Sequence, residues 1–304
     1  MAADPAALRI GLVGYGEVGR ILTAALVARG VAWVGTWDRL LADPEAGPAM
    51  RGHAARAGVA ATVSLADLLA RADVAISAVT ASEALAVARE AVGAIRPGTW
   101  FVDLNSASPG AKQAMSGLIE GAGGRFVESA VMTSVPPYGI GVPMLLGGRD
   151  APALRDLLAP LGFATEVASD RIGVASAVKM CRSVMIKGLE ALVTESFTAA
   201  RAYGVEDRVL ASLHETFPAL DWEQLGSYLM SRSALHGKRR AEEMREVALT
   251  VREAGLDPWL AAATAERQDW MGRQKVALAL DRLGKDADWR AYADRLLAAR
   301  PPKT

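Results

Sequence analysis

Short apolar segments rich in β-branched residues alternate with longer amphipathic segments over the first half of the chain. The short segments predict strands and the longer ones predict helices. The expected strands are Leu8–Val13, Val31–Thr36, Ala60–Val63, Val74–Val79, Trp100–Leu104, Arg125–Ser129 and Met144–Leu146. The expected helices are Val18–Arg29, Ser64–Arg71 with Ser64 as N-cap, Ser82–Ile95 and Pro109–Gly121. Strands and helices that alternate at this spacing are joined by right-handed crossovers, so the pattern predicts a doubly wound parallel sheet.

The strand pattern ends near Ser169, and helical periodicity continues beyond it. Ile172–Tyr203 contains no proline and predicts one long helix or two joined end to end. Further helices are expected at Asp207–Thr216, Trp222–Gly255 and Pro258–Leu283. We therefore expect two domains without a flexible linker, an α/β domain over residues 1–169 and an all-α domain over residues 170–304.

Composition limits the partners that this chain can have. Its 304 residues are 51% hydrophobic and 22% charged, enough apolar material for two packed cores. Lysine and arginine (34) balance aspartate and glutamate (34), so no net charge attracts the protein to nucleic acid or to an acidic membrane. We expect a small-molecule partner.

Cysteine and histidine are scarce. The single Cys181 excludes an internal disulfide, and three histidines leave little material for a metal site, so we predict none. The longest apolar runs, such as Val74–Val79, fall far short of the roughly 20 residues of a membrane span. Met1–Pro5 lacks the basic stretch and apolar core of a secretory signal, so a reducing cytoplasm is the expected location.

A glycine pattern directly follows the first expected strand and opens the first expected helix. It has the form G-x-G-x-x-G and consists of Gly14, Tyr15, Gly16, Glu17, Val18 and Gly19. The first glycine permits a tight turn, the second lets the backbone approach a pyrophosphate, and the third allows close packing of helix on sheet. The helix N-terminus then offers unpaired N–H groups to the anion. The turn predicts a dinucleotide site on a Rossmann domain.

An acidic residue stands where the second expected strand ends. The Asp38 carboxylate is placed to accept hydrogen bonds from both hydroxyls of the adenine ribose. It would also repel a 2′-phosphate, so we predict NAD as the cofactor. Arg39 is able to bind that phosphate instead, which leaves NADP open.

Three later segments make the chain resemble the β-hydroxyacid dehydrogenase family, which includes 3-hydroxyisobutyrate and 6-phosphogluconate dehydrogenases. Ala78-Val79-Thr80 stands where the family packs against the cofactor. Asp103–Pro109 is similar to the family's Asp-x-Ser-Thr-x-x-Pro loop beside the nicotinamide, and Gly173–Lys179 to the Gly-x-Gly-x-x-x-Lys segment that carries the catalytic lysine. The resemblance implies that Val79, Thr80 and Asn105 bind cofactor, Ser106 contacts substrate and Lys179 is catalytic.

The C-terminal half is similar to a small branch of that family with its own helical domain, described as 6-phosphogluconate dehydrogenase-like. Lys187–Leu192 and His236–Arg240 carry this likeness. It implies an interleaved homodimer, in which the helical domain of one subunit helps to close the site of the other.

The chain departs from the family where substrate specificity is decided. Glu128–Ser134 replaces the usual Asp-x-Pro-Val-Ser-Gly-Gly loop and lacks its glycine pair, so Met132 and Thr133 become the candidate substrate contacts. Arg182 and Ser183 occupy the helical turn where the family carries asparagine. The carboxylate that assists decarboxylation falls on Ile186, which argues against oxidative decarboxylation.

Oxidation of a secondary alcohol needs a base for the hydroxyl proton, and reduction needs the matching acid. Lysine serves both directions when burial tunes it toward neutrality, and Lys179 lies in an otherwise apolar helical run. The alternative is a structural lysine that reaches solvent along its stem. Arg182 is suited to clamp a substrate carboxylate in a bidentate pair, or to form an ordinary salt bridge.

Two further cationic positions are candidates. His236 and Arg239 are suited to bind an anionic substrate, although Lys238-Arg239-Arg240 is also typical of a solvated helix face. For Lys187 we favour a surface position over one that lines the cleft. For Met132 and the tryptophans at 222, 259 and 270 we favour the core over a recognition role.

The interpretation that joins these features is an NAD(P)-dependent oxidoreductase that transfers a hydride to or from a small hydroxy acid or carbonyl compound. An imine reductase of the same architecture is an alternative, although Lys179 replaces the Asp or Tyr typical of that class. A cofactor-binding sensor or scaffold without turnover is the alternative outside the enzymes.

Overall fold

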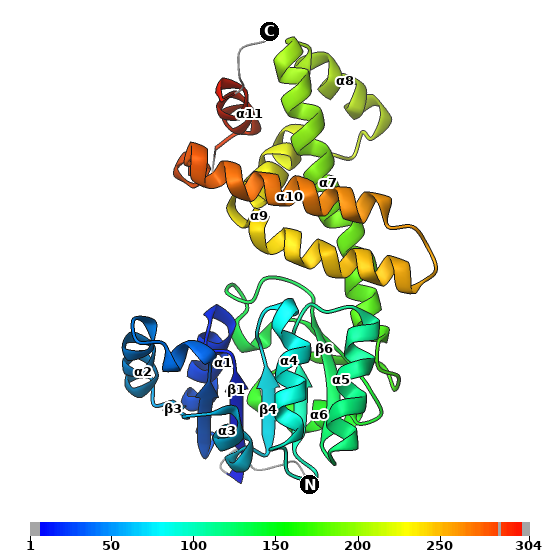
Figure 1. Cartoon of the computed structure of the whole chain (residues 1–304). Coiled ribbons are helices and arrows are strands. Elements are labelled where there is room, and N and C mark those ends of the chain that lie inside the picture. Colours follow the sequence, from blue (N-terminus) through cyan, green and yellow to red (C-terminus); the bar gives the residue numbers. More distant parts are fainter. Residues whose placement is uncertain (1–6, 285–286, 300–304) are drawn as a thin grey trace. The chain divides into compact units, whose positions relative to one another are not determined.

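The computed structural model describes residues 7–284 and 287–299. The chain divides into two compact units, Met1–Met180 and Cys181–Thr304. The change of pattern at Ser169 coincides with the end of the last strand, whereas the boundary between the units falls inside the helix that follows it. Figure 1 shows the strands in the first unit and, over the described residues, only helices in the second.

The first unit is built on an eight-stranded sheet in the order β3-β2-β1-β4-β5-β6-β7-β8. Its strands are β1 (Arg9–Val13), β2 (Trp33–Trp37), β3 (Ala60–Ala61), β4 (Val74–Ser77), β5 (Trp100–Asp103), β6 (Arg125–Val131), β7 (Met144–Gly147) and β8 (Thr165–Ser169). The strands from β3 to β6 pair in parallel, as the alternating pattern predicts. The order reverses beside β1, so that β1 and β4 flank the topological switch point where such sheets bind ligands.

The parallel prediction is wrong at one pair, because β7 runs antiparallel to β6. A parallel neighbour requires a crossover, usually through a helix. Here the connection from 132 to 143 contains only the short 3-10 helix Gly139–Gly141, and the Met132 amide donates to the Pro143 carbonyl at 3.0 Å. The chain therefore turns back beside β6 instead of crossing the sheet.

In the described part of the first unit, the sheet is accompanied by the helices α1 (Glu17–Ala28), α2 (Ala46–Arg56), α3 (Leu65–Arg71), α4 (Ala81–Val92), α5 (Pro109–Gly121) and α6 (Ala151–Leu158). The Ser64 hydroxyl caps α3 by accepting from the Asp67 amide at 3.0 Å, as expected. The pattern does not predict α2, which contains Gly47, Pro48 and Gly52, or α6 and β8. Tertiary packing stabilises α2, because Met50 and Ala54 are buried in the core.

Apolar residues alternate between the two faces of the sheet. On β4, Val74 and Ile76 belong to one core cluster, whereas Ala75 belongs to the other. The first cluster includes side chains of α1 and α6, and the second includes those of α3, α4 and α5. This period of two is what a sheet covered on both faces requires.

The second unit is helical, and a single uninterrupted helix, α7 (Val174–Tyr203), enters it from the first. The helices that follow are α8 (Glu206–Thr216), α9 (Trp222–Glu253), α10 (Trp259–Leu278) and α11 (Trp289–Ala298). Ala279 (φ 49°) separates α10 from the 3-10 helix Leu280–Leu283, where the sequence predicts one continuous helix. α9 and α10 pack backbone to backbone, because a Cβ on Gly237 would lie 2.5 Å from the Gln268 carbonyl oxygen.

The expectation of core tryptophans holds only in part. Trp222 and Trp270 are half-buried and pack against the core of the helical unit, whereas Trp259 is 78% exposed at the start of α10. The buried tryptophan of this unit is Trp289 on α11, a helix that the sequence pattern does not predict. Within the described residues, no helix has both the length and the apolar composition of a membrane span.

Candidate functional site

The glycine turn between β1 and α1 has the geometry of a phosphate cradle. Gly14 has φ 99°, and a Cβ there would lie 2.5 Å from the Ala78 carbonyl oxygen. A Cβ on Gly19 would lie 2.1 Å from the Gly14 carbonyl oxygen. Gly16 is exposed, and a Cβ on it would meet nothing within 4 Å. The outer glycines are therefore required by packing, whereas the middle one leaves open space beside the start of α1, which has no side-chain cap. This arrangement fits a pyrophosphate.

Asp38 lies at the end of β2 and is fixed from two sides. Its Oδ2 accepts from the Tyr15 amide at 2.8 Å, and its Oδ1 accepts from the Leu40 amide at 2.9 Å. Each carboxylate oxygen keeps a second lone pair for a further donor. The carboxylate is thus bound to the glycine turn and keeps the capacity to accept from a further donor.

Tyr15 contributes its backbone to this arrangement. Its side chain is fully buried, and its hydroxyl lies 3.0 Å from His53 Nδ1 on α2. Burial raises the pKa of Tyr15. The predicted cofactor residue therefore orients Asp38 through its amide, while its ring supports α2. Glu17 and Val18 open α1, with Glu17 exposed and Val18 half-buried.

An ion pair links the segment after β2 to helix α4 at the carboxyl end of the parallel strands. Arg39, directly after Asp38, has its Nη1 3.0 Å from Oε2 of Glu83 on α4. Thr80, at the N-terminus of α4, is exposed, and its hydroxyl lies 3.1 Å from that of Ser82. The local sequence around Glu83 does not mark it, because an acidic residue in a helix carries no sign of a partner on another element.

A buried polar network holds the loops after β4 and β5. Asn105 accepts from the Val79 amide at 2.7 Å and donates to the Ser77 hydroxyl at 2.9 Å and to Asp103. Asp103 also forms a buried ion pair with Lys112 of α5, whose ammonium donates to the Asp103 carbonyl at 3.0 Å. Asn105 is 4% exposed and its amide is engaged inside the protein. It therefore positions the Val79 loop rather than presenting its side chain to a ligand.

Lys179 and Ser106 meet at this loop. Lys179 Nζ donates to the Ser106 hydroxyl at 2.7 Å, although the two residues are 73 positions apart. Both side chains are half-buried. The structure thus brings together the two residues that the family resemblance marks as catalytic and substrate-contacting. It does not support the alternative of a lysine that extends freely into solvent.

Glu128 of β6 holds the start of the helix that carries Lys179. Its buried carboxylate accepts from the amides of Gly173 at 2.6 Å, Ala175 at 3.1 Å and Ser176 at 3.2 Å. These are the amides that a helix N-terminus leaves without partners. In the sequence, Glu128 stands out only as part of the segment that departs from the family loop. An acidic residue in the middle of a predicted buried strand is the signal that could have marked it.

Met132 and Thr133 follow β6, half-buried and exposed respectively. Their assignment as substrate contacts remains a prediction.

In the helical unit, Arg182 is exposed, and the structure shows no ion pair for it among the described residues. Ser183 is buried and accepts from Lys187 Nζ at 2.9 Å. The surface assignment of Lys187 is wrong: it is 8% exposed and pairs with Glu243 at 3.1 Å, because the long α9 covers this face of α7.

A charged cluster lies among α7, α9 and α10. Glu190 is 1% exposed, with Arg240 Nε at 2.9 Å and Gln268 Nε2 donating at 3.0 Å. Burial nevertheless raises the pKa of Glu190 to about 7. Burial and the neighbouring cations, Arg232 first among them, lower the pKa of His236 to about 4. Arg239 is exposed and lies 3.6 Å from Glu243. The predicted residues His236 and Arg239 thus belong to a cation-rich region of the helical unit.

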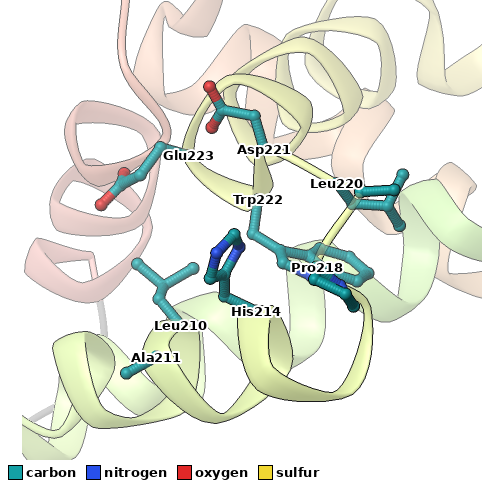
Figure 2. A pocket seen from close by; sticks show the side chains of 9 residues that line it. Leu210, Ala211, His214, Pro218, Leu220, Asp221, Trp222 and Glu223 are labelled. Atoms are coloured by element: carbon teal, nitrogen blue, oxygen red, sulfur yellow. The ribbon is translucent and has the colours of Figure 1, made fainter.

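A separate open hollow of about 570 Å³ lies between α8 and the start of α9. Figure 2 shows His214, Pro218 and Trp222 around it. Its walls contain none of the residues that the sequence marks as functional, and it lies far along the chain from the glycine turn.

Comparison with known proteins assigns the chain to a family. A family model described as the NAD binding domain of 6-phosphogluconate dehydrogenase matches residues 9–161, half of the chain. The glycine turn and Asp38 lie within this match, and the first unit is an NAD(P)-binding domain. The chain belongs to this 6-phosphogluconate dehydrogenase-like family. A second model, a domain of unknown function, matches residues 200–271 of the helical unit.

Solved structures agree with this assignment. A conserved hypothetical protein from Sinorhizobium meliloti 1021 is 37% identical, with 96% of each chain covered and a TM-score of 0.78. A conserved protein of unknown function, described as structurally similar to 3-hydroxyacid dehydrogenases, is 35% identical over 88% of this chain and 98% of its own, with a TM-score of 0.70. The 3-hydroxyisobutyrate dehydrogenase of Mycobacterium tuberculosis, determined with L-serine, shares the fold at 20% identity, over 95% and 99% of the chains and with a TM-score of 0.70.

Proposed function

We propose that this protein is an NAD(P)-dependent oxidoreductase that interconverts a small hydroxy acid and the corresponding carbonyl compound. The observation that carries the proposal is the hydrogen bond of 2.7 Å between Lys179 and Ser106 in an NAD(P)-binding unit. It joins a proton-transfer group to a hydroxyl on the loop after β5, at the carboxyl end of the sheet. Ligands of open α/β sheets bind at that end.

The residues of this chain would divide the work between binding and proton transfer. When bound, the nicotinamide cofactor supplies the hydride acceptor or donor. Gly14–Gly19 and Asp38 hold its pyrophosphate and adenine ribose, and Asn105 positions the Val79 loop. Lys179 removes the proton from the substrate hydroxyl or returns it to the carbonyl, while Ser106 orients both the lysine and the substrate oxygen.

We further propose NAD over NADP. This is supported by the Asp38 carboxylate at the end of β2, which is fixed to the glycine turn and would repel a 2′-phosphate. An anionic substrate is supported by Arg182, three residues beyond Lys179 on α7. We also propose a homodimer. Exposed Val178, Met185 and Leu192 recur every seven residues along α7, which leaves an apolar stripe that a second copy would cover. Light scattering at micromolar concentration measures this directly, and a monomer would contradict it.

The test of catalysis is Lys179→Met. Because positioned proton transfer contributes about 10²–10⁴ in rate, we expect kcat to fall by about that factor in an NADH-linked assay of hydroxy acids, ketoacids, aldehydes and imines. NADH affinity and melting temperature should stay near wild type, since the cofactor residues lie elsewhere.

Lys238→Met, on an exposed position of α9, is the matched control and should keep full activity. A Lys179→Met enzyme that retains a tenth of wild-type kcat would disprove the lysine role. Turnover of imines alone would favour the imine reductase, and NADH binding without any turnover would favour the sensor.

A further inference from the structure

The Arg39–Glu83 ion pair crosses the end of the sheet where the cofactor binds. Arg39 follows β2, and Glu83 lies in the first turn of α4, which follows β4. In the sheet, β1 lies between β2 and β4. The pair, 3.0 Å between Nη1 and Oε2, therefore spans the carboxyl end of β1, where the glycine turn begins.

The charges around this pair bear directly on the adenine ribose. The Asp38 carboxylate is fixed by the Tyr15 and Leu40 amides. Arg39 is the adjacent cation, but its guanidinium already faces the carboxylate of Glu83. A 2′-phosphate carries between one and two negative charges at neutral pH, by analogy with other phosphate monoesters. It would have to compete with Glu83 for Arg39 and would approach two carboxylates.

We propose that Glu83 is a specificity-determining residue that disfavours NADP(H) by engaging Arg39. This inference rests on the proposed function only in that the first unit binds NAD(P). With NAD, whose adenine ribose carries an unmodified 2′-hydroxyl, the ion pair between Arg39 and Glu83 stays formed. With NADP, Arg39 leaves Glu83 for the phosphate, and the uncompensated Glu83 charge opposes binding.

The pair suits a clean substitution because its loss has little effect on the fold. Its side chains are 69% and 39% exposed, and exposed ion pairs contribute little to stability. Glu83→Gln keeps the size of the side chain and removes its charge. Glu90→Gln is the matched control, because Glu90 is an exposed acid on the same helix two turns further from its N-terminus.

The experiment is a titration of each protein with NADPH and with NADH, followed by quenching of tryptophan fluorescence, since Trp37 directly precedes Asp38. For Glu83→Gln the NADPH Kd should fall about 3- to 10-fold at low ionic strength, and the gain should shrink at high salt. The NADH Kd should stay within about 2-fold of wild type, because its ribose hydroxyl carries no charge. Glu90→Gln should behave as wild type.

Arg39→Gln, alone and combined with Glu83→Gln, separates the mechanism from a general charge effect. If Glu83 acts through Arg39, the gain in NADPH affinity should disappear in the Arg39→Gln background. A gain that persists without Arg39, or equal changes for both nucleotides, would overturn the inference while leaving NAD(P) binding intact. Wild-type protein that binds neither nucleotide would overturn the proposed function itself, and the inference with it.

Discussion

Buried carboxylates are held in different ways in the two units. In the first unit, Glu128 accepts three backbone amides at the start of α7. In the helical unit, Glu190 is bound by the side chains of Arg240 and Gln268. Backbone amides are held in place by the fold, whereas side-chain donors must themselves be ordered and desolvated.

The carboxylates of the two units therefore have different roles. Those of the first unit hold parts of the proposed site in position, whereas Glu190 of the helical unit titrates near neutral pH. Glu128 and Asp103 fix the two segments that carry Lys179 and Ser106, so their contacts decide the geometry of the proposed site. For Glu190, burial outweighs Arg240, Lys187 and Gln268 and raises the pKa to about 7. We therefore expect mutations in the first unit to act on geometry and stability, and those in the helical cluster to act on pH dependence.

The largest effect is expected from Lys112→Met. It leaves Asp103 buried without its cation, and removal of one partner from a buried pair typically costs about 3–5 kcal/mol. Urea unfolding of wild type and variant measures the loss. Lys275→Met, a half-buried lysine of α10 bound to the Leu235 carbonyl, is the control and should lose much less. Equal losses would show that the Asp103 pair is not special.

The helical cluster should show two opposing pH effects. Because the folded pKa of Glu190, about 7, lies above its ordinary 4.5, its contribution to stability is present below pH 4.5 and is lost as the pH rises to 7. Because the folded pKa of His236, about 4, lies below 6.5, its contribution is present above pH 6.5 and is lost as the pH falls to 4. The two trends oppose each other between pH 5 and 7.

Urea unfolding at pH 5, 6 and 7 tests this balance. Wild type should vary little. Glu190→Gln should gain stability with rising pH by about 2–3 kcal/mol relative to wild type over this window. His236→Gln should lose stability by a smaller amount, because His236 is half-buried and solvent screens its charge. Parallel profiles for all three proteins would show that neither group titrates in this range and would remove the contrast between the units.

Glu128→Gln tests the positional role. With its carbonyl at the Oε1 position the glutamine keeps the bonds to the Gly173 and Ala175 amides, but its NH₂ group faces the Ser176 amide, which also donates; this should cost about 1–3 kcal/mol. We expect a lower kcat with NADH affinity unchanged, and a shift in the pH profile of kcat, because the start of α7 carries Lys179. A less stable protein with an unchanged kcat and pH profile would reduce Glu128 to a structural residue.

The smallest expected effect is that of Arg182→Met. Arg182 is exposed, so we expect kcat/KM to fall by about 10-fold for anionic substrates and to change little for neutral ones. Arg208→Met, another exposed arginine of the helical unit, is the control. Equal losses for both substrate classes would mean that Arg182 does not bind the anionic group.

The sequence by itself determined the features that depend on neighbours along the chain. The continuous apolar run that begins at Val74, the proline-free run of α7 and the glycine turn follow from local sterics and burial patterns, and the structure confirms these elements. Weak local signals failed, as in the glycine-containing α2, where packing of Met50 compensates for low helix propensity. Lys179 was identified through family likeness, since its spacing alone also fits a surface lysine.

Only the tertiary structure decided which distant residues meet. The Lys179–Ser106 bond, the hold of Glu128 on α7 and the Arg39–Glu83 pair each join separate elements. It also decided that Lys187 is buried and that β7 runs antiparallel to β6. The local sequence around a charged residue is the same whether its side chain is exposed to water or paired with another residue. Its role therefore depends on which surface the fold packs against it, and local periodicity carries no information about that surface.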